Sequence, residues 1–362
     1  MFNIFMIFII LLLLFMVIYI IKSFTMIKII EKIKNKYIRV IISLLPLILV
    51  FILFNYVNAV VILFHLFIFL VLSQILFFIY KKISKKNIDK SIHVICGIII
   101  TVIYLSIGAY LDYHVFETRY EVETNKNIGT DRFRIIQISD THVGTTFDGD
   151  GLSKHIDRIS KIDADLVVIT GDFVDDDTTR EDMIKSCKSL SEFNTKYGVY
   201  FIYGNHDRGY YNYRNFNSND LINELEKNNV FVLKDEVIEL NDYIYLIGRE
   251  DKQYQRKTIE ELTKDLDKSK YMIDLNHQPN DYENEKSAQV DLVLNGHTHG
   301  GQLFPLGYIG LMIGANDMFK GSKKDDNTTF IVNTGLSDWA IDFKTGTKSE
   351  YTVIDIINKK GD

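Results

Sequence analysis

The sequence predicts a layered α/β sandwich, with mixed sheets flanked by helices, that is preceded by a helical transmembrane region. The first 111 residues are mostly Ile, Leu, Phe and Val, and the rest is polar and acidic. In the polar part, short β-rich runs alternate with helix-like stretches, the pattern of a layered α/β domain. We expect about four membrane helices over 1–111, a linker or first strand over 112–132, and a soluble domain over 133–362.

The apolar part contains runs of the length needed to cross a bilayer. Phe2 to Ile21 is about twenty apolar residues without a charge. A signal peptide would need a basic start and a small-residue cleavage site, and neither is present. Ile38 to Tyr80 is long enough for two crossings, divided at Asn55 to Asn58, and Ile92 to Leu111 is the fourth segment. Three crossings are the alternative, with one helix lying in the interface.

Lys and Arg collect in two of the loops between these segments. The basic residues of these loops are Lys22, Lys28, Lys32, Lys34, Lys36 and Arg39 in one and Lys81, Lys82, Lys85, Lys86 and Lys90 in the other. Cytoplasmic loops carry such residues, so the N-terminus and the chain after Leu111 should lie outside. We expect a multi-pass plasma membrane protein with an extracytoplasmic soluble domain and with membrane lipids as partners. The alternative is a polybasic lipid-binding surface without topological meaning.

Composition excludes other classes of protein. The net charge is -6, so the chain has no signal for general nucleic-acid binding. The two cysteines, Cys96 and Cys187, can build neither a disulfide framework nor a thiolate metal site. Nothing in the sequence indicates an oligomeric state.

The soluble part is predicted to contain alternating strands and helices. The expected strands are Phe133 to Ser139, Leu166 to Thr170, Val199 to Tyr203, Tyr243 to Ile247, Met272 to Leu275, Asp291 to Leu294, Phe330 to Asn333 and Tyr351 to Ile356, with Val115 to Glu123 as a further candidate. The expected helices are Leu152 to Lys161, Glu181 to Tyr197, Asp220 to Lys227 and Thr258 to Lys268.

Five polar clusters come directly after these β-rich runs. They are Asp140-Thr-His142, Gly171-Asp172, Gly204-Asn205-His206-Asp207, Asn276-His277 and Gly296-His297-Thr-His299. Ligand sites of α/β sheets form at the carboxyl ends of strands. Glycines beside the polar residues permit tight turns and a close approach of the backbone.

The side chains of these clusters are metal donors. Seven donors are present: Asp140, His142, Asp172, Asn205, His277, His297 and His299. Imidazole, carboxylate and amide oxygen without thiolate suit Mn, Fe, Zn or Co. One ion does not need seven protein ligands, whereas two ions that share a bridging carboxylate do. Two divalent ions of this kind serve phosphoryl hydrolysis.

The histidines support this interpretation as a set. The chain has nine, and five of the six candidates beyond His114 fall in the strand-end clusters, leaving out only His155. A single histidine would be better interpreted as a satisfied structural residue. Five at strand ends, with two Asp and one Asn, favour a metal site.

At this point the sequence resembles a known family. In order, Asp140-x-His142, Gly171-Asp172, Gly204 to Asp207, His277 and Gly296-His297-x-His299 are similar to the five blocks of calcineurin-like metallophosphoesterases. The resemblance covers Phe133 to Ile356. Three further stretches resemble the membrane-associated bacterial branch described as YkuE-like: Gly296 to Gln302, His277-Gln278-Pro279 and Gly248 to Asp251.

The resemblance implies a metallophosphoesterase sandwich over 133–362 and a role for each site residue. One metal would be held by Asp140, His142 and His299, and the other by Asn205, His277 and His297, with Asp172 bridging the two. The catalytic residues would be His206, which is not a ligand and which protonates the leaving oxygen or steadies the phosphate, and Asp175, which orients His206. Asp175 could instead be a helix N-cap or a solvated member of an acidic run.

The sequence departs from the family in two places. Asn276 stands where many relatives carry Ser, Asp or another small residue, and this position is not a ligand. The stretch from Gly335 to Ile356 lacks the Arg- and Pro-rich pattern expected of lipid-processing or exported relatives, which weakens the transfer of a substrate.

The resulting expectation is a metal-dependent phosphoric ester hydrolase that acts on a phosphate mono- or diester. Three readings remain open: hydrolysis of a lipid or cell-envelope phosphoester, hydrolysis of soluble nucleotides or phosphate esters by a membrane-confined enzyme, and a non-catalytic scaffold. Retention of all seven donors argues against the scaffold. Tyr210, Tyr211 and Tyr213 follow the fourth donor and could line a substrate cleft or form a packed aromatic loop.

Overall fold

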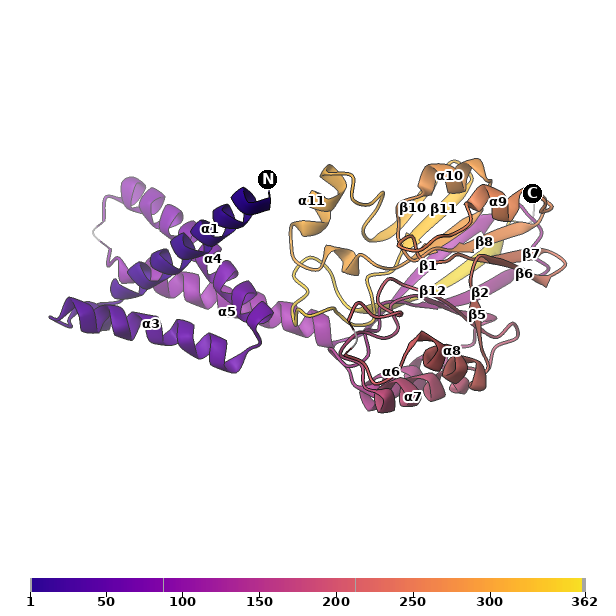
Figure 1. The fold of residues 1–362 in the computed structure, drawn as a ribbon. Helices are drawn as coiled ribbons and strands as arrows, with labels where there is room; N and C mark the ends of the chain where they lie inside the picture. The colour runs from indigo at the N-terminus through magenta and orange to yellow at the C-terminus, as the bar shows by residue number, and fades with distance from the viewer. Residues whose placement is uncertain (1, 87, 212, 360–362) are drawn as a thin grey trace. The chain divides into compact units, whose positions relative to one another are not determined.

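The computed structural model describes residues 2–86, 88–211 and 213–359, and it forms two compact units, Met1–Ala109 and Tyr110–Asp362. The first unit is helical and the second contains both sheets (Figure 1). The split falls close to the boundary expected from the change in composition at residue 111.

The first unit is built from apolar helices. They are α1 (Phe2–Thr25), α2 (Lys28–Glu31), α3 (Lys36–Leu53), α4 (Tyr56–Ser84) and α5 (Ser91–Tyr113), whose last residues belong to the second unit. The side chain of Asn55 accepts a hydrogen bond from the N–H of Asn58 and so caps α4. The long apolar run therefore breaks at the expected polar residues.

Membrane association follows from the length and apolarity of these helices. Among the described residues, α3, α4 and α5 are long and apolar enough to cross a membrane. Helix α1 is also apolar over Ile10–Thr25. The side chains of residues 2–6, 8 and 9 lie outside the described ones. The number of crossings stays a prediction.

The second unit contains two six-stranded mixed sheets among the described residues. The first has the order β1-β12-β2-β3-β4-β5 and the second the order β10-β11-β9-β8-β7-β6. The strands of the first sheet are β1 (Phe116–Thr124), β12 (Glu350–Asn358), β2 (Arg132–Ile138), β3 (Leu166–Thr170), β4 (Val199–Ile202) and β5 (Val230–Leu233). Those of the second are β10 (Gly321–Asp325), β11 (Thr328–Val332), β9 (Leu292–Asn295), β8 (Tyr271–Leu275), β7 (Ile244–Gly248) and β6 (Glu236–Asn241).

Each sheet contains a parallel block with antiparallel pairing on one side in the first sheet and on both sides in the second. Strands β2 to β5 pair in parallel, and β12 is antiparallel to β2 but parallel to β1. Strands β11, β9, β8 and β7 pair in parallel, with β10 and β6 antiparallel at the edges. Parallel strands point the same way, so their carboxyl ends meet at one edge of each sheet.

Helices cover the outer faces of both sheets, and one apolar core lies between the sheets. The helices of the second unit are α6 (Gly149–Ile159), α7 (Arg180–Ser189), α8 (Ser218–Lys227), α9 (Ile259–Thr263), α10 (Tyr282–Ser287) and α11 (Leu306–Met312). Ile135 and Val168 of the first sheet pack with Leu246 and Ile273 of the second. A separate core joins the first sheet to α6–α8, and another joins the second sheet to α9 and α10. The expected layered sandwich is confirmed.

Some elements of the structure differ from those predicted from the sequence. The expected helix Glu181 to Tyr197 ends as α7 at Ser189, followed by a 3₁₀ turn over Leu190–Glu192, and α9 is shorter than Thr258 to Lys268. Strands β5, β6 and β10 and helices α10 and α11 were not expected. Strands β6 and β10 lie at sheet edges and have exposed residues, so they lack the apolar runs on which the expectation rested.

Candidate metal centre

All seven predicted donors come directly after strands of the parallel blocks. Asp140 and His142 follow β2, Asp172 follows β3, and Asn205 follows β4. The other three follow strands of the second sheet: His277 follows β8, and His297 and His299 follow β9. The centre therefore draws donors from both sheets.

The backbone at this edge is held in an unusual conformation. Five of the predicted donors have a positive φ: Asp140 at 50°, His142 at 35°, Asp172 at 53°, His297 at 71° and His299 at 46°. Residues other than glycine seldom adopt this region, and it costs roughly 1–3 kcal/mol each. Such strain concentrates at functional sites because the surrounding structure imposes it.

Two glycines let the loops approach one another closely. A Cβ atom at Gly204 would lie 2.2 Å from Oδ1 of Asp172, and one at Gly296 would lie 1.8 Å from Oγ of Ser139. Both distances are far below van der Waals contact. A side chain at either position would push two donor loops apart.

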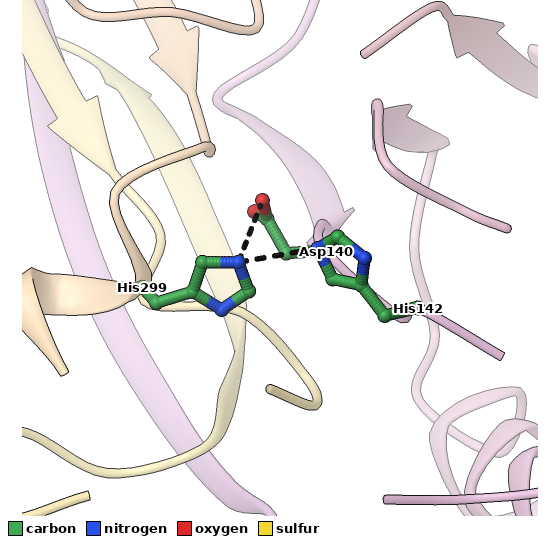
Figure 2. Close-up of side chains that lie close together, drawn as sticks. All are labelled: Asp140, His142 and His299. Carbon is green, nitrogen blue, oxygen red and sulfur yellow. Dashed lines mark hydrogen bonds and ion pairs between the residues drawn. The ribbon is translucent and has the colours of Figure 1, made fainter. Parts of the chain in front are cut away.

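The first group of donors consists of Asp140, His142 and His299 (Figure 2). Their ligand atoms lie within 4.8 Å of one another. Nε2 of His142 lies 3.2 Å from Nε2 of His299, which lies 3.7 Å from Oδ1 of Asp140. Two neutral imidazole nitrogens that face each other with lone pairs repel, and a cation shared between them removes this repulsion. The donor set thus fits a divalent ion.

The second group contains Asp172, His277 and His297, with Asn205 beside them. Nε2 of His277 lies 3.2 Å from Oδ2 of Asp172 and 3.1 Å from Oδ1 of Asn205. The same Oδ2 of Asp172 lies 3.6 Å from Nε2 of His142, in the first group. Asp172 therefore faces both groups, as a bridging carboxylate must.

The far nitrogen of three histidines is engaged by the protein. Nδ1 of His142 donates to Oδ2 of Asp175 at 2.7 Å, and Nδ1 of His277 donates to the carbonyl of Thr170 at 2.7 Å. Nδ1 of His299 lies 3.3 Å from the carbonyl of Ser337. Such bonds fix the tautomer, leaving Nε2 free to bind a metal. All three Nε2 atoms point into the centre.

The predicted catalytic pair lies beside the first group. Nδ1 of His206 is 3.3 Å from Oδ1 of Asp175, whose other oxygen holds His142. Asp175 is buried, and α7 is capped by Thr179, so Asp175 is neither an N-cap nor a solvated member of the acidic run. Ligand atoms of His142, Asp175 and His206 also lie within 4.8 Å of one another.

Burial and neighbouring charges set the protonation of these groups. Burial disfavours the charged form of Asp175, but hydrogen bonds from His142 and His206 outweigh it and hold the pKa of Asp175 below its ordinary value. Burial likewise disfavours the positively charged form of His206. The hydrogen bond to Asp175 and the negative charge of Asp172 outweigh burial and raise the pKa of His206. Burial lowers the pKa of His297 to about 4. The imidazole of His297 is therefore neutral, the form that binds metals.

Asp207 belongs to the third cluster, Gly204 to Asp207, but had no predicted role. Its carboxylate accepts backbone N–H bonds from Asp172 at 2.8 Å, Phe173 at 2.8 Å, Val174 at 3.1 Å and Gly204 at 2.7 Å. It therefore ties the loop after β3 to the loop after β4. The backbone N–H of His206 also donates to Oδ1 of Asp172, at 2.8 Å.

Two buried charges behind His299 were missed as well. Oδ1 of Asp338 lies 3.3 Å from Nδ1 of His299 and 3.4 Å from Nζ of Lys344. That Nζ also donates to the carbonyls of Thr334 and Ser337, each at 3.0 Å. Burial raises the pKa of Asp338 to about 6, against the opposing charge of Lys344. Asp338 lies several residues beyond the end of β11 at Val332 and not directly after it, so the rule that found the other clusters does not reach it.

Tyr210 holds the amide of Asn205. Its hydroxyl accepts from Nδ2 of Asn205 and from Nε2 of Gln253, both at 2.7 Å. With Nδ2 occupied in this way, Oδ1 of Asn205 is the atom that faces His277. The ring of Tyr210 also packs edge-on against His206, with 4.9 Å between centroids.

The stretch Gly248 to Asp251 lies behind the second group. Arg249 is buried, and its Nη1 lies 2.7 Å from Asp281 and 3.2 Å from Glu285. Glu285 accepts from Nδ2 of Asn276 at 2.8 Å, so the residue before His277 is held by this charged layer. Asn276, at which the sequence departs from the family, thus has a structural role and is not a metal ligand.

The geometry agrees with comparison to known proteins. The model of the calcineurin-like phosphoesterase family matches residues 133–301. The chain is 33% identical over 211 residues to a metallophosphoesterase of Aquifex aeolicus, covering 56% of this chain and 77% of the relative. The chain belongs to the calcineurin-like metallophosphoesterase family.

Two other relatives bear on the branch and on the membrane part. The metallophosphoesterase YkuE of Bacillus subtilis is 30% identical over 257 residues, which is 67% of this chain and 86% of YkuE. A transmembrane protein with a metallophosphoesterase domain from Danio rerio is 28% identical over 236 residues, which is 61% of this chain and 52% of the relative. The resemblance seen in the sequence is confirmed, and the family implies a metal-dependent phosphoesterase.

Proposed function

We propose that the protein is a two-metal phosphoesterase that hydrolyses a phosphate mono- or diester. The observation that carries the proposal is the sharing of Asp172, whose Oδ2 faces His277 at 3.2 Å and His142 at 3.6 Å. One ion would be held by Asp140, His142 and His299, and the other by Asn205, His277 and His297. When bound, two divalent ions supply a water-derived nucleophile and neutralise charge on the phosphoryl oxygens.

His206 would act on the leaving group. Its Nδ1 faces Asp175, so its Nε2 is the nitrogen left for a substrate. In this position it donates a proton or a hydrogen bond to the departing oxygen, a contribution of about 10²–10⁴ in rate. Asp175 holds the ring and keeps the proton on Nδ1.

A hollow beside His206 would receive the leaving portion of the substrate. Its volume is about 490 Å³, and it is lined by Asp175, Asp176, Asp177, His206, Tyr210, Tyr211, Tyr213, Trp339 and Ala340. The ring of Trp339 lies 5.7 Å from that of His206. Aromatic walls favour an apolar or planar group, and the three carboxylates disfavour a second anionic one. The position of the tyrosines that follow the third cluster therefore favours a substrate cleft over a packed aromatic loop.

Membrane association favours a lipid or cell-envelope phosphoester as substrate. The alternative is a soluble nucleotide or phosphate ester hydrolysed by a membrane-confined enzyme. The test is a panel of lipid and soluble phosphoesters with Mn-loaded full-length protein, with chelated protein as the control. We expect turnover that is highest on bilayer-embedded substrates. Faster hydrolysis of soluble esters would favour the alternative, and two bound ions without any turnover would favour a scaffold.

We also propose that the metallophosphoesterase domain is extracytoplasmic. Two ion pairs within the helical unit support this: Lys90 to Glu31 at 2.5 Å and Lys28 to Asp89 at 3.8 Å. They join the loop after α1 to the loop after α4, so both basic loops lie at the same end of the helices. Basic loops stay in the cytoplasm. Alkaline phosphatase fused after Leu111 should be active and a fusion after Lys90 inactive; the reverse pattern would place the site in the cytosol.

A further inference from the structure

The segment that follows the last predicted metal ligand exposes a continuous series of apolar side chains. Between Gly300 and Gly314 the chain carries no charged residue. The exposed apolar side chains are Phe304, Leu306, Tyr308, Ile309, Leu311, Met312 and Ile313. Met312 is 86% exposed and Ile313 is 74% exposed. Isolated exposed apolar residues are ordinary, but a contiguous group marks a surface that is covered in the working protein.

The base of this segment is fixed to the domain. Gly301 and Gly307 pack backbone to backbone, so a Cβ at Gly301 would lie 2.4 Å from Cα of Gly307. Nε2 of Gln302 donates to the carbonyl of Ile341 at 3.0 Å, and the N–H of Phe304 donates to Oγ1 of Thr345 at 3.1 Å. The exposed tip therefore stands on a rigid base that begins two residues after His299.

The shape of the segment is a protrusion. Figure 1 shows α11 standing apart from the two sheets of its unit. Helix α11 spans seven residues, about 10 Å at 1.5 Å per residue. It cannot cross a bilayer core of about 30 Å. An apolar protrusion of this length can enter the interface between headgroups and acyl chains.

We propose that this protrusion, residues 304–313, inserts into the surface of the lipid bilayer. The chain supplies the reason to choose lipid: α3, α4 and α5 are long and apolar enough to cross a membrane. Only two residues separate the end of α5 at Tyr113 from the start of β1 at Phe116. The sheet unit therefore starts where an apolar helix leaves the bilayer, and lipid is the apolar phase within reach.

Side-chain chemistry agrees with an interfacial position. Phe304 and Tyr308 lie at the base, with 6.2 Å between their ring centroids, and Tyr308 packs against Phe319 at 5.1 Å. Aromatic rings settle at the level of the headgroups. Met312 and Ile313 are more exposed than either ring and would enter the acyl region. Insertion would hold the metal ligands of the same loop at the membrane surface.

The test uses full-length protein in lipid nanodiscs that each hold one chain, so that a second copy cannot cover the protrusion. In a Cys96→Ala background, which leaves the buried Cys187, an environment-sensitive fluorophore is attached at Ile309→Cys or Met312→Cys. The matched control is Phe231→Cys, an exposed apolar residue on β5 that is 55% exposed. Lipids carrying spin labels then quench any fluorophore that contacts acyl chains.

We expect blue-shifted emission and strong quenching at 309 and 312, and water-like, unquenched emission at 231. Met312→Asp with Ile313→Asp should reverse the quenching of a fluorophore at 309. Blue-shifted emission without quenching would mean that protein covers the protrusion and would overturn the proposal. Water-like emission at 309 and 312 would overturn it too, and a shift seen only with two chains per disc would identify a second copy as the occupant.

Discussion

Both groups of metal donors contain carboxylate and imidazole side chains, with the amide of Asn205 added in the second, but different kinds of partner hold them. In the first group, a carboxylate, Asp175, holds His142, and the buried Asp338 lies against His299. In the second group, the carbonyl of Thr170 holds His277, and the hydroxyl of Tyr210 holds Asn205. Bonds to charged partners contribute about 1.5–3 kcal/mol, against 0.5–1.5 kcal/mol for neutral ones. The first group should therefore depend more strongly on its supporting residues.

The largest effect should come from the residue that both groups share. Asp172→Ala removes the carboxylate that faces His142 and His277, so we expect loss of bound metal from both groups and loss of turnover. Elemental analysis and a phosphodiesterase assay measure the two. Asp163→Ala is the control, because Asp163 is an exposed acid outside the donor loops and outside the hollow beside His206. An Asp172→Ala protein that keeps full metal content would contradict the bridging role.

Substitution of His206 should lower turnover without lowering the metal content. We expect His206→Ala to retain its metal and to lose about 10²–10⁴ in turnover, the range for a general acid. His155→Ala is the matched control, since His155 packs on Phe147 outside the clusters. Metal content and kcat are measured on both. If His206→Ala emptied the centre, His206 would be a ligand and its proposed role would be wrong.

The comparison between the two groups predicts unequal effects of their supporting residues. Asp175→Asn replaces a charged partner of His142 and should lower metal affinity by about 10–100-fold. Tyr210→Phe removes a neutral partner of Asn205 and should lower it by no more than about 10-fold. Tyr211→Phe is the control, because its exposed ring stacks on Tyr213. Metal titration measures the affinities, and a larger loss in Tyr210→Phe would reverse the comparison.

The donors were predictable from the sequence because each follows a strand that ends in a run of buried residues. Leu166–Thr170, Tyr271–Leu275 and Leu292–Asn295 are fully buried runs. A short apolar run of this kind predicts a buried strand, and the polar residues directly after it can then be recognised as candidate ligands. The edge strands β6 and β10 carry exposed and charged residues, so the same rule passed over them.

The supporting residues were harder to predict because their roles depend on contacts across the fold. Asp175 was expected to orient His206, but its bond to His142 was not expected, nor was the contact between Lys344 and Asp338. Their contacts join separate loops and leave no spacing pattern in the chain. The protrusion at 304–313 was missed for a different reason. An apolar run predicts burial, and only the structure shows it exposed.

The central claim is that the seven donors hold two divalent ions. It is tested most directly by the metal content of full-length protein purified under metal-replete conditions, together with its turnover. We predict about two divalent ions per chain in active protein, because Asp172 faces both donor groups and each group alone can hold one ion. A reproducible content of one ion or fewer in fully active protein would contradict the two-metal account.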